Sequence, residues 1–261
     1  MKKISYIISA LALSLTLGSC GNDFLQVVPS DKYSDATVFT STDGAQKVLT
    51  GAYDMLTSGH YAHYTNQYIF FMPDVMGDDA MVNSTGNYNR FVPAYQYSFT
   101  SNSTYSVDPW IGCYTIIDNC NAILDNIGNL PDGSERNRIE GEALALRAYA
   151  YHFVVRAYAK PVNRYPDSQG VVLRLTSNTD DVPRSTVKEC YTQLVGDIEK
   201  AVGLLAGNSS SSKCYINEQG AHAIAARLYL DLGDYTNGVK HAKAALQGIA
   251  LMSTADYKLN M

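Results

Sequence analysis

One segment constrains the fold of this 261-residue chain more than any other, and it reads LALRAYAYHFVVRAY over residues 144–158. Apolar residues occupy almost every side of the helix that it would form, and no Gly or Pro interrupts it. Such a helix is stable only when other elements pack against several of its faces. We therefore predict a helix over 134–159 at the centre of a domain. Arg147, inside this stretch, should pair with a buried carboxylate or with carbonyl groups.

Other helices are predicted where apolar residues recur every three or four positions, and this pattern is found over 43–58 and 108–127. Two capping boxes are predicted, at Asp132–Glu135 and Thr186–Glu189, each opening a helix. The second of these helices should reach residue 205. Residues 160–185 carry three prolines and form an irregular excursion, and the stretch near 70–100 could hold short strands. The fold class is therefore mostly α, with an irregular Tyr-rich insertion.

The last two predicted helices, near 217–232 and 234–248, form a pair that resembles a tetratricopeptide repeat. Small Ala residues let two antiparallel helices approach closely, and Gly233 turns the chain between them. Gly238 stands where such a repeat usually has Ala. One pair cannot bury its apolar face alone. A second repeat is predicted from two earlier helices, 134–159 and 186–205, split by the excursion.

The N-terminus has the pattern of a bacterial lipoprotein signal peptide over residues 1–19. Lys2 and Lys3 precede a short apolar run that ends in Leu17-Gly-Ser-Cys20. This run is too short to span a membrane. A Cys after small residues can be cleaved at its amino side and acylated on its thiol. We predict a lipid anchor on Cys20; the alternative is an ordinary secretory peptide with a chance Cys.

Charge and cysteine content exclude some classes of function. The net charge is −5 at pH 7, which gives no overall basic field for nucleic acid. No Cys-x-x-Cys pair is present. Cys113 and Cys120 would lie ~10 Å apart on one helix, too far for a disulfide. We predict that these two and Cys190 and Cys214 are small buried residues, with a Cys190–Cys214 bridge as the alternative.

Tyrosine is the unusual residue of the composition, with 20 Tyr against one Trp. Seven Tyr fall between residues 61 and 105, interleaved with Asp, Asn and Arg. Aromatic rings can stack on the C–H faces of sugars while polar neighbours fix the hydroxyls. The predicted glycan-binding residues are Asp79, Asn83, Asn87, Tyr88 and Arg90. For any single Tyr, packing of the insertion onto the helices is the competing interpretation, and Trp110 fits a core position better than a sugar platform.

The sequence gives no sign of catalysis, and we predict no catalytic residue, no cofactor and no metal. Asp78 and Asp79 are adjacent, so they do not form the facing carboxylate pair of a glycosidase. Fingerprints of nucleotide binding and of serine hydrolases are absent. His60 and His63 lie three apart, but no further ligand stands at a telling spacing.

Three segments together resemble the SusD/RagB family of outer-membrane nutrient-binding lipoproteins. They read CGNDFLQVVPS at 20–30, EALALRAYAYHF at 142–153, and DIEKAVGLL at 197–205 followed by the repeat at 221–246. Their order and spacing agree across 20–246. The resemblance implies a mostly α fold on a tetratricopeptide scaffold, a lipid anchor, and binding residues in the Tyr-rich region.

The resemblance also implies function. It implies capture of glycans, or of peptides in some members, and delivery to a TonB-dependent outer-membrane transporter as partner. Family members are roughly twice this length, so residues 20–261 correspond to an N-terminal, tetratricopeptide-like region, and we expect the chain to be truncated at its C-terminus. A pure protein-interaction scaffold without its own ligand, and a glycoside hydrolase, remain as rival interpretations.

Overall fold

The computed structural model describes residues 38–57, 67–78, 80–83, 85–178, 180–208, 214–250 and 252–259. The chain divides into two units at Phe39, and the helices and strands below belong to the unit Phe39–Met261. The predicted signal peptide 1–19, with Cys20, lies outside the described residues, as do His60 and His63.

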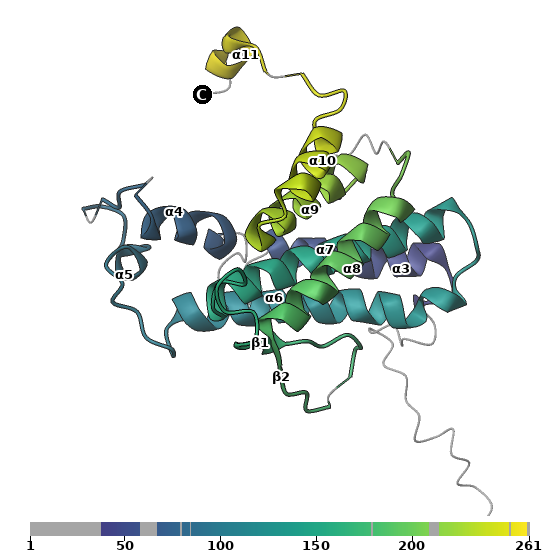
Figure 1. The fold of residues 1–261 in the computed structure, drawn as a ribbon, viewed down its shortest axis with the longest axis horizontal. Coiled ribbons are helices and arrows are strands. Elements are labelled where there is room, and N and C mark those ends of the chain that lie inside the picture. The colour runs from purple at the N-terminus through teal and green to yellow at the C-terminus, as the bar shows by residue number, and fades with distance from the viewer. Residues whose placement is uncertain are drawn as a thin grey trace, which may run out of the picture. The chain divides into compact units, whose positions relative to one another are not determined.

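Helices make up most of this unit, as predicted (Figure 1). The α-helices are α3 (Thr42–Thr57), α4 (Met72–Met76), α5 (Val92–Tyr95), α6 (Thr104–Asn126), α7 (Ser134–Tyr158), α8 (Val187–Leu204), α9 (Glu218–Leu232), α10 (Tyr235–Ala245) and α11 (Thr254–Leu259). A π-helical turn, Gln67–Phe71, leads into α4, and a 3-10 turn, Ile127–Asn129, follows α6. Two short strands, β1 (Gln169–Val172) and β2 (Arg184–Thr186), pair antiparallel.

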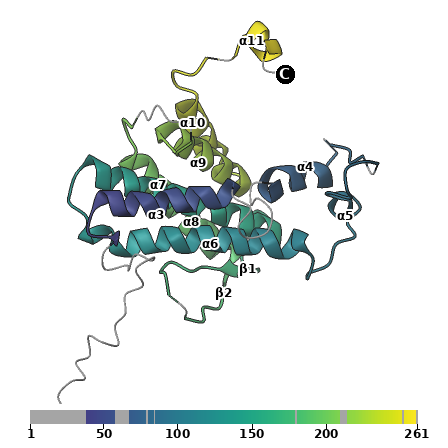
Figure 2. The ribbon, with the colours of Figure 1, turned by 180° about the vertical axis from the view of Figure 1, so that it is seen from behind.

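Helix α7 is the centre of the unit, which confirms the prediction from its apolar sequence. It packs against α3, α6, α8 and α9. Helix α8 lies on the near side of α7 in Figure 1, and α3 lies on the near side in the reverse view of Figure 2. Every residue from Ile139 to Ala148 is buried. Gly141 permits the close approach of the chain after α8, because a Cβ there would lie 2.8 Å from Leu205 Cγ.

Arg147 has the buried partner that the sequence requires. Its Nε and Nη2 donate to the two carboxylate oxygens of Asp197 on α8, each at 2.8 Å, and its Nη1 donates to Asn121 Oδ1 on α6 at 2.8 Å. Gln193 Nε2 also donates to Asp197 Oδ1, at 2.8 Å. Arg147 and Asp197 are only 6% and 4% exposed. This polar cluster therefore joins the three longest central helices.

Side chains of α6 and α7 hold the excursion after α7 in place. Tyr151, which is fully buried, accepts from Arg174 N at 2.7 Å and donates to Arg174 O at 2.8 Å. Tyr114 donates to Val172 O at 2.7 Å. Asn121 Nδ2 donates to Arg174 O at 2.9 Å. The excursion was predicted to be irregular, yet it contains β1 and β2, whose register pairs Gln169 with Thr186.

The α9–α10 hairpin has the predicted turn at Gly233, which adopts a φ of 74° and caps α9. At Gly238, where a tetratricopeptide repeat usually has Ala, an added Cβ would lie 3.7 Å from Ala226 O, an ordinary contact. The Tyr229 ring stacks on His241 of α10 at a centroid distance of 5.4 Å. Tyr235, the first residue of α10, is 68% exposed.

Of the other local predictions, one is confirmed and two need correction. The capping box at Thr186–Glu189 is present, with both of its reciprocal hydrogen bonds. The one predicted at Asp132 is wrong: Gly133 is the N-cap of α7, and the Asp132 carboxylate pairs with Arg136 instead. The stretch near 70–100 forms helical turns rather than strands.

Two further corrections concern α6 and the cysteines. Helix α6 begins at Thr104, a turn before Pro109, which it accommodates internally. Cys113, Cys120 and Cys190 are buried, but Cys214 is exposed. None of the four forms a disulfide, so the Cys190–Cys214 bridge is absent.

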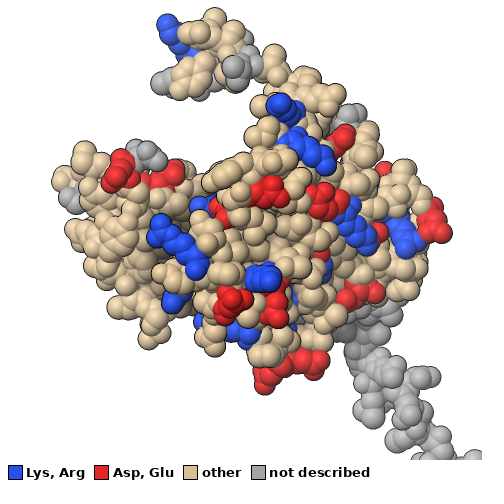
Figure 3. Space-filling model, viewed as in Figure 1, with Lys and Arg blue, Asp and Glu red and all other residues tan. Residues whose placement is uncertain are grey.

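The surface of the described residues mixes charges. On the face drawn in Figure 3, acidic and basic side chains are interspersed rather than gathered into one field. Within the described ranges, no helix has the length and apolar character needed to cross a bilayer.

Candidate ligand-binding site

Most of the predicted ligand-binding residues lie on one exposed turn between α4 and α5. Asn87, Tyr88 and Arg90 follow one another there, and the Tyr88 side chain is 91% exposed. Asn87 Nδ2 donates to Arg90 O at 3.1 Å, and the Arg90 N–H donates to Asn87 O at 3.2 Å. Asn83 precedes the turn, and its Oδ1 accepts from Thr85 N at 2.9 Å. Asp79 lies outside the described residues.

The backbone of this turn is unusual. Tyr88, Asn89 and Phe91 have φ values of 55°, 63° and 57°, in the left-handed region that L residues seldom adopt. Each such residue costs on the order of 1–3 kcal/mol, so the neighbouring structure must hold it. The Tyr105 hydroxyl helps by accepting from Phe91 N at 2.8 Å. The result is a turn that presents the Tyr88 ring to solvent beside Asn87 and Arg90.

The Arg90 side chain is exposed and forms no hydrogen bond with another described residue, so its guanidinium is available to a ligand. The Oδ1 atom of Asn87 is buried and has no hydrogen-bond partner among the described residues. A guanidinium beside an exposed ring can donate to hydroxyl groups. The structure therefore brings together three of the five predicted residues, and Asn83 lies shortly before them.

The other Tyr of the insertion divide between packing and exposure. Tyr68 is buried and donates to Asp108 Oδ2 at 3.2 Å, while Tyr105 packs against Tyr68 and Phe91. Tyr97 is exposed, and its hydroxyl donates to Met76 O. Trp110 is half-buried between the rings of Tyr114 and Tyr158 at centroid distances of 4.6 and 5.1 Å, as expected for a packing residue. Tyr61 and Tyr64 lie outside the described residues.

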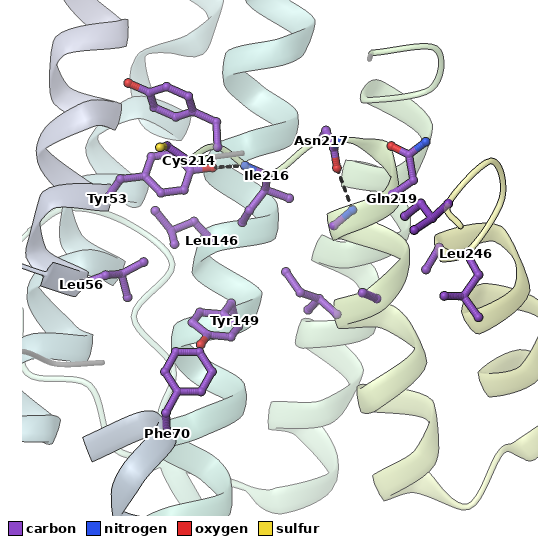
Figure 4. A pocket seen from close by; sticks show the side chains of 16 residues that line it. Tyr53, Leu56, Phe70, Leu146, Tyr149, Cys214, Ile216, Asn217, Gln219 and Leu246 are labelled. Atoms are coloured by element: carbon purple, nitrogen blue, oxygen red, sulfur yellow. Dashed lines mark hydrogen bonds between the residues drawn. The ribbon is translucent and has the colours of Figure 1, made fainter. Parts of the chain in front are cut away.

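A large hollow lies elsewhere among the described residues, and the sequence did not indicate it. It has a volume of ≈ 870 Å³ and is walled by α3, α7, α9 and the segment before α9. Figure 4 shows Tyr53, Leu146 and Tyr149 along one wall, with Leu246 across from them. These walls come from segments about 160 residues apart, so no local pattern could have revealed the cavity. The high Tyr content of the sequence was the feature that could have indicated an aromatic cavity.

The wall at Tyr53 is fixed by a buried polar chain. The Tyr53 hydroxyl accepts from Ile216 N at 3.0 Å (Figure 4) and donates to Glu142 Oε2 at 3.1 Å. Glu142 Oε1 also accepts from Arg138 Nη1 at 2.6 Å. Burial raises the pKa of the Glu142 carboxyl, although the Arg138 and Tyr53 donors lower it. The Tyr215 ring packs edge-on against Tyr53 at 5.1 Å.

A second polar cluster joins α7, α8 and α9 through Asp231. Its Oδ2 atom lies 2.7 Å from His152 Nε2, accepts from the Tyr191 hydroxyl at 3.0 Å, and lies 3.4 Å from Arg156 Nε. Burial lowers the pKa of His152 even beside this carboxylate. Because three side chains share this one carboxylate oxygen, we interpret the cluster as a structural link between the helices. No group of three or more His, Cys, Asp or Glu in the described part of the chain is placed to hold a metal ion.

Fold and geometry thus define a helical, tetratricopeptide-like protein with an exposed aromatic turn and an aromatic cavity. Comparison with known proteins agrees with this class. A SusD-like family model, described as "Starch-binding associating with outer membrane", matches residues 23–230. The chain belongs to this SusD-like family.

Relatives within the family are longer than this chain. A SusD-like protein of Bacteroides ovatus is 24% identical over 242 residues, which cover 91% of this chain and 41% of that protein. The crystal structure of a SusD-like carbohydrate binding protein from Bacteroides vulgatus is 26% identical, with a TM-score of 0.76, over 84% of this chain and 47% of that one. A SusD superfamily protein from Bacteroides thetaiotaomicron is 28% identical, with a TM-score of 0.72, over 83% and 49%. The chain therefore spans about half the length of these relatives.

Proposed function

We propose that this chain captures glycans at the outer membrane, anchored there by lipid on Cys20, and passes them to a TonB-dependent transporter. The observation that carries the proposal is the Tyr88 turn, which holds an aromatic ring 91% exposed beside Asn87 and Arg90 in a family described as starch-binding. An exposed ring on a backbone that costs free energy to maintain favours a role in binding over a role in packing.

Each residue of the proposed site has a distinct role. The Tyr88 ring would stack on the C–H face of a sugar. Arg90 would donate to a hydroxyl, and Asn87 would orient the turn through the bond from its Nδ2 to Arg90 O. Asn83 and Asp79 would contact the neighbouring part of the glycan. The proposal is of binding without chemistry, and a reducing-sugar assay tests the rival glycoside hydrolase.

The replacement Tyr88→Ala should weaken glycan binding by about 1–2 kcal/mol, or roughly 5- to 30-fold in Kd. Alanine keeps the Cβ atom, so the backbone cost at this φ stays, and the change removes only the ring. The full chain is first run through gels that contain amylopectin, arabinoxylan or polygalacturonan. The affinity of wild type and variant for the retarding glycan is then measured by calorimetry.

The matched control is Tyr165→Ala, since Tyr165 is a second exposed Tyr on the excursion, away from the turn. It should leave the affinity unchanged. Thermal melts of both variants should match wild type, because an exposed ring contributes little to the core. Equal affinities for wild type and Tyr88→Ala would move the site elsewhere. A large loss of stability would make Tyr88 a packing residue.

Two other functions are alternatives. The tetratricopeptide-like hairpin of α9 and α10 supports a protein-interaction scaffold without its own ligand as the main one. In that case no glycan would retard it, but it would still bind the transporter. Peptide capture is the other alternative, and it would appear as binding to peptides in the same calorimetric assay.

The replacement Cys20→Ala should leave the chain unprocessed or release it from the membrane fraction. Acyl chains contribute ~0.8 kcal/mol for each buried CH₂, so two or more chains give stable anchoring. Fractionation and intact mass of wild type and variant, expressed in a Gram-negative host, measure the effect. Unchanged mass and unchanged membrane retention would rule out the lipid on Cys20.

A further inference from the structure

Three adjoining hollows lie along one face of α7, and we call them together the α7 groove. Their volumes are ≈ 870, 580 and 510 Å³. The first two share Tyr149 in their walls, and the second and third share Phe153. Helix α7 lines the groove from Leu146 to Tyr158, a length of ~18 Å at about 1.5 Å per residue. The groove is therefore long enough for an extended ligand.

Aromatic rings line the α7 groove along its whole length. Phe70 stands at the junction of the first two hollows and is 50% exposed. Rings from the π-helical turn, α6, α7 and the segments before α6 and α9 line these hollows. They include Tyr215, Phe70, Tyr149, Phe153, Phe99 and Tyr105. Such a series offers successive flat apolar surfaces, which suit the C–H faces of consecutive sugar rings.

Polar side chains without partners line the first two hollows. The Arg227 guanidinium and the Asp74 carboxylate both line the second hollow, and neither forms a hydrogen bond or ion pair with another described residue. The same holds for the Gln219 amide in the first hollow. The Tyr149 hydroxyl also has no hydrogen-bond partner among the described residues, and burial raises its pKa to about 12, so it remains a donor at neutral pH.

These polar groups decide between possible occupants. An apolar helix face laid into the α7 groove would remove Arg227 and Asp74 from water without giving them partners, which is costly. A ligand that carries hydroxyl groups on an otherwise flat ring satisfies both the aromatic and the polar groups. A protein segment is the competing occupant, and the experiment below separates the two.

We infer that the α7 groove is a binding site for an extended oligosaccharide, whose rings stack on Phe70 and Tyr149 and whose hydroxyls bond to Arg227, Asp74 and Gln219. The inference rests on the proposed glycan-binding function and locates a second, longer contact surface apart from the Tyr88 turn. An extended polysaccharide would then be held along α7, and the turn would make an additional contact.

The test uses two variants of the full chain, Phe70→Ala and Arg227→Gln. Both side chains are exposed, so the fold should tolerate the changes. The probes are amylopectin, arabinoxylan and polygalacturonan in gels, followed by calorimetry with whichever retards the wild type. Each variant should bind about tenfold more weakly, the size of one strong contact. Thermal melts should match the wild type.

Matched controls are Phe71→Ala and Arg164→Gln, an exposed Phe next to the groove and an exposed Arg on the excursion. Neither lines the α7 groove, and both should bind like wild type. If the wild type is retarded and both groove variants bind equally well, the inference is wrong while the proposed function stands. That result, with loss only in Tyr88→Ala, would leave the turn as the site. If no polysaccharide retards the wild type, the proposed function fails and the inference fails with it.

Discussion

Replacing Asp197 by Ala should lower the free energy of unfolding by about 3–5 kcal/mol. The change leaves the Arg147 guanidinium buried between α6, α7 and α8 without its two carboxylate bonds, both 2.8 Å long in the wild type. Only the bond to Asn121 Oδ1 and a longer one to a backbone carbonyl would remain. A buried charge that has lost its partner costs far more than the pair contributes, because water cannot reach it. Denaturant titration of the full chain measures the loss.

Two further variants test the physical reason for this loss. In Asp43→Ala, the removed carboxylate pairs with Lys47 at the surface, and the cost should be at most about 1 kcal/mol. In the double variant Arg147→Met with Asp197→Leu, no charge remains to be buried, and much of the lost stability should return. A loss below about 1 kcal/mol in Asp197→Ala would show that the cluster is hydrated and not a buried tie.

Local signals in the sequence predict most of the helices well. Apolar periodicity, the capping boxes and the repeat pattern together place α3, α7, α8, α9 and α10 within a few residues of their observed bounds. The Thr186 box and the turn at Gly233 act through backbone groups of their immediate neighbours, so they can be read from short stretches. Arg147 could also be predicted to have a partner, since an unpaired charge in so apolar a segment would be too costly.

Local sequence signals predicted the wrong structure at several positions. At Asp132, the carboxylate was expected to cap α7, but Arg136 lies one turn away and pairs with it instead. The aromatics near 70–100 are compatible with short strands, yet the described residues of this segment form helical turns. Cys214 was expected to be buried because its residue type usually is, but it lies in the exposed connection before α9.

The candidate sites differ in how far the sequence could reveal them. The Tyr88 turn is a single polar, Gly-containing stretch, so its exposure could be predicted from composition. The α7 groove could not, because it forms only when the turn before α4, the helix α7 and the start of α9 come together. The spacing of the 20 Tyr along the sequence does not show which of them will line the same cavity.

Gly170, in β1, marks the closest approach between the excursion and α8. An added Cβ there would lie 2.8 Å from Cys190 Sγ and 2.9 Å from both the carbonyl carbon and the oxygen of Thr186. Backbone atoms cannot move aside as a flexible side chain can. Thr186 is also the N-cap of α8, and its hydroxyl accepts from Glu189 N at 3.2 Å. A side chain at position 170 therefore presses on both the strand pair and the start of α8.

The replacement Gly170→Ala should destabilise the chain by about 1–3 kcal/mol. The upper end of this range is expected, because the added Cβ would clash with backbone atoms of Thr186. The matched control is Gly196→Ala in α8, where an added Cβ would meet no atom within 4 Å. That variant should gain roughly 0.5–1 kcal/mol, since Ala is the better helix residue. Denaturant titrations of both variants measure the two effects, which should have opposite signs. If Gly170→Ala is as stable as wild type, β1 does not lie against Thr186 and Cys190, and the excursion is held by other contacts, such as those of Tyr114, Asn121 and Tyr151.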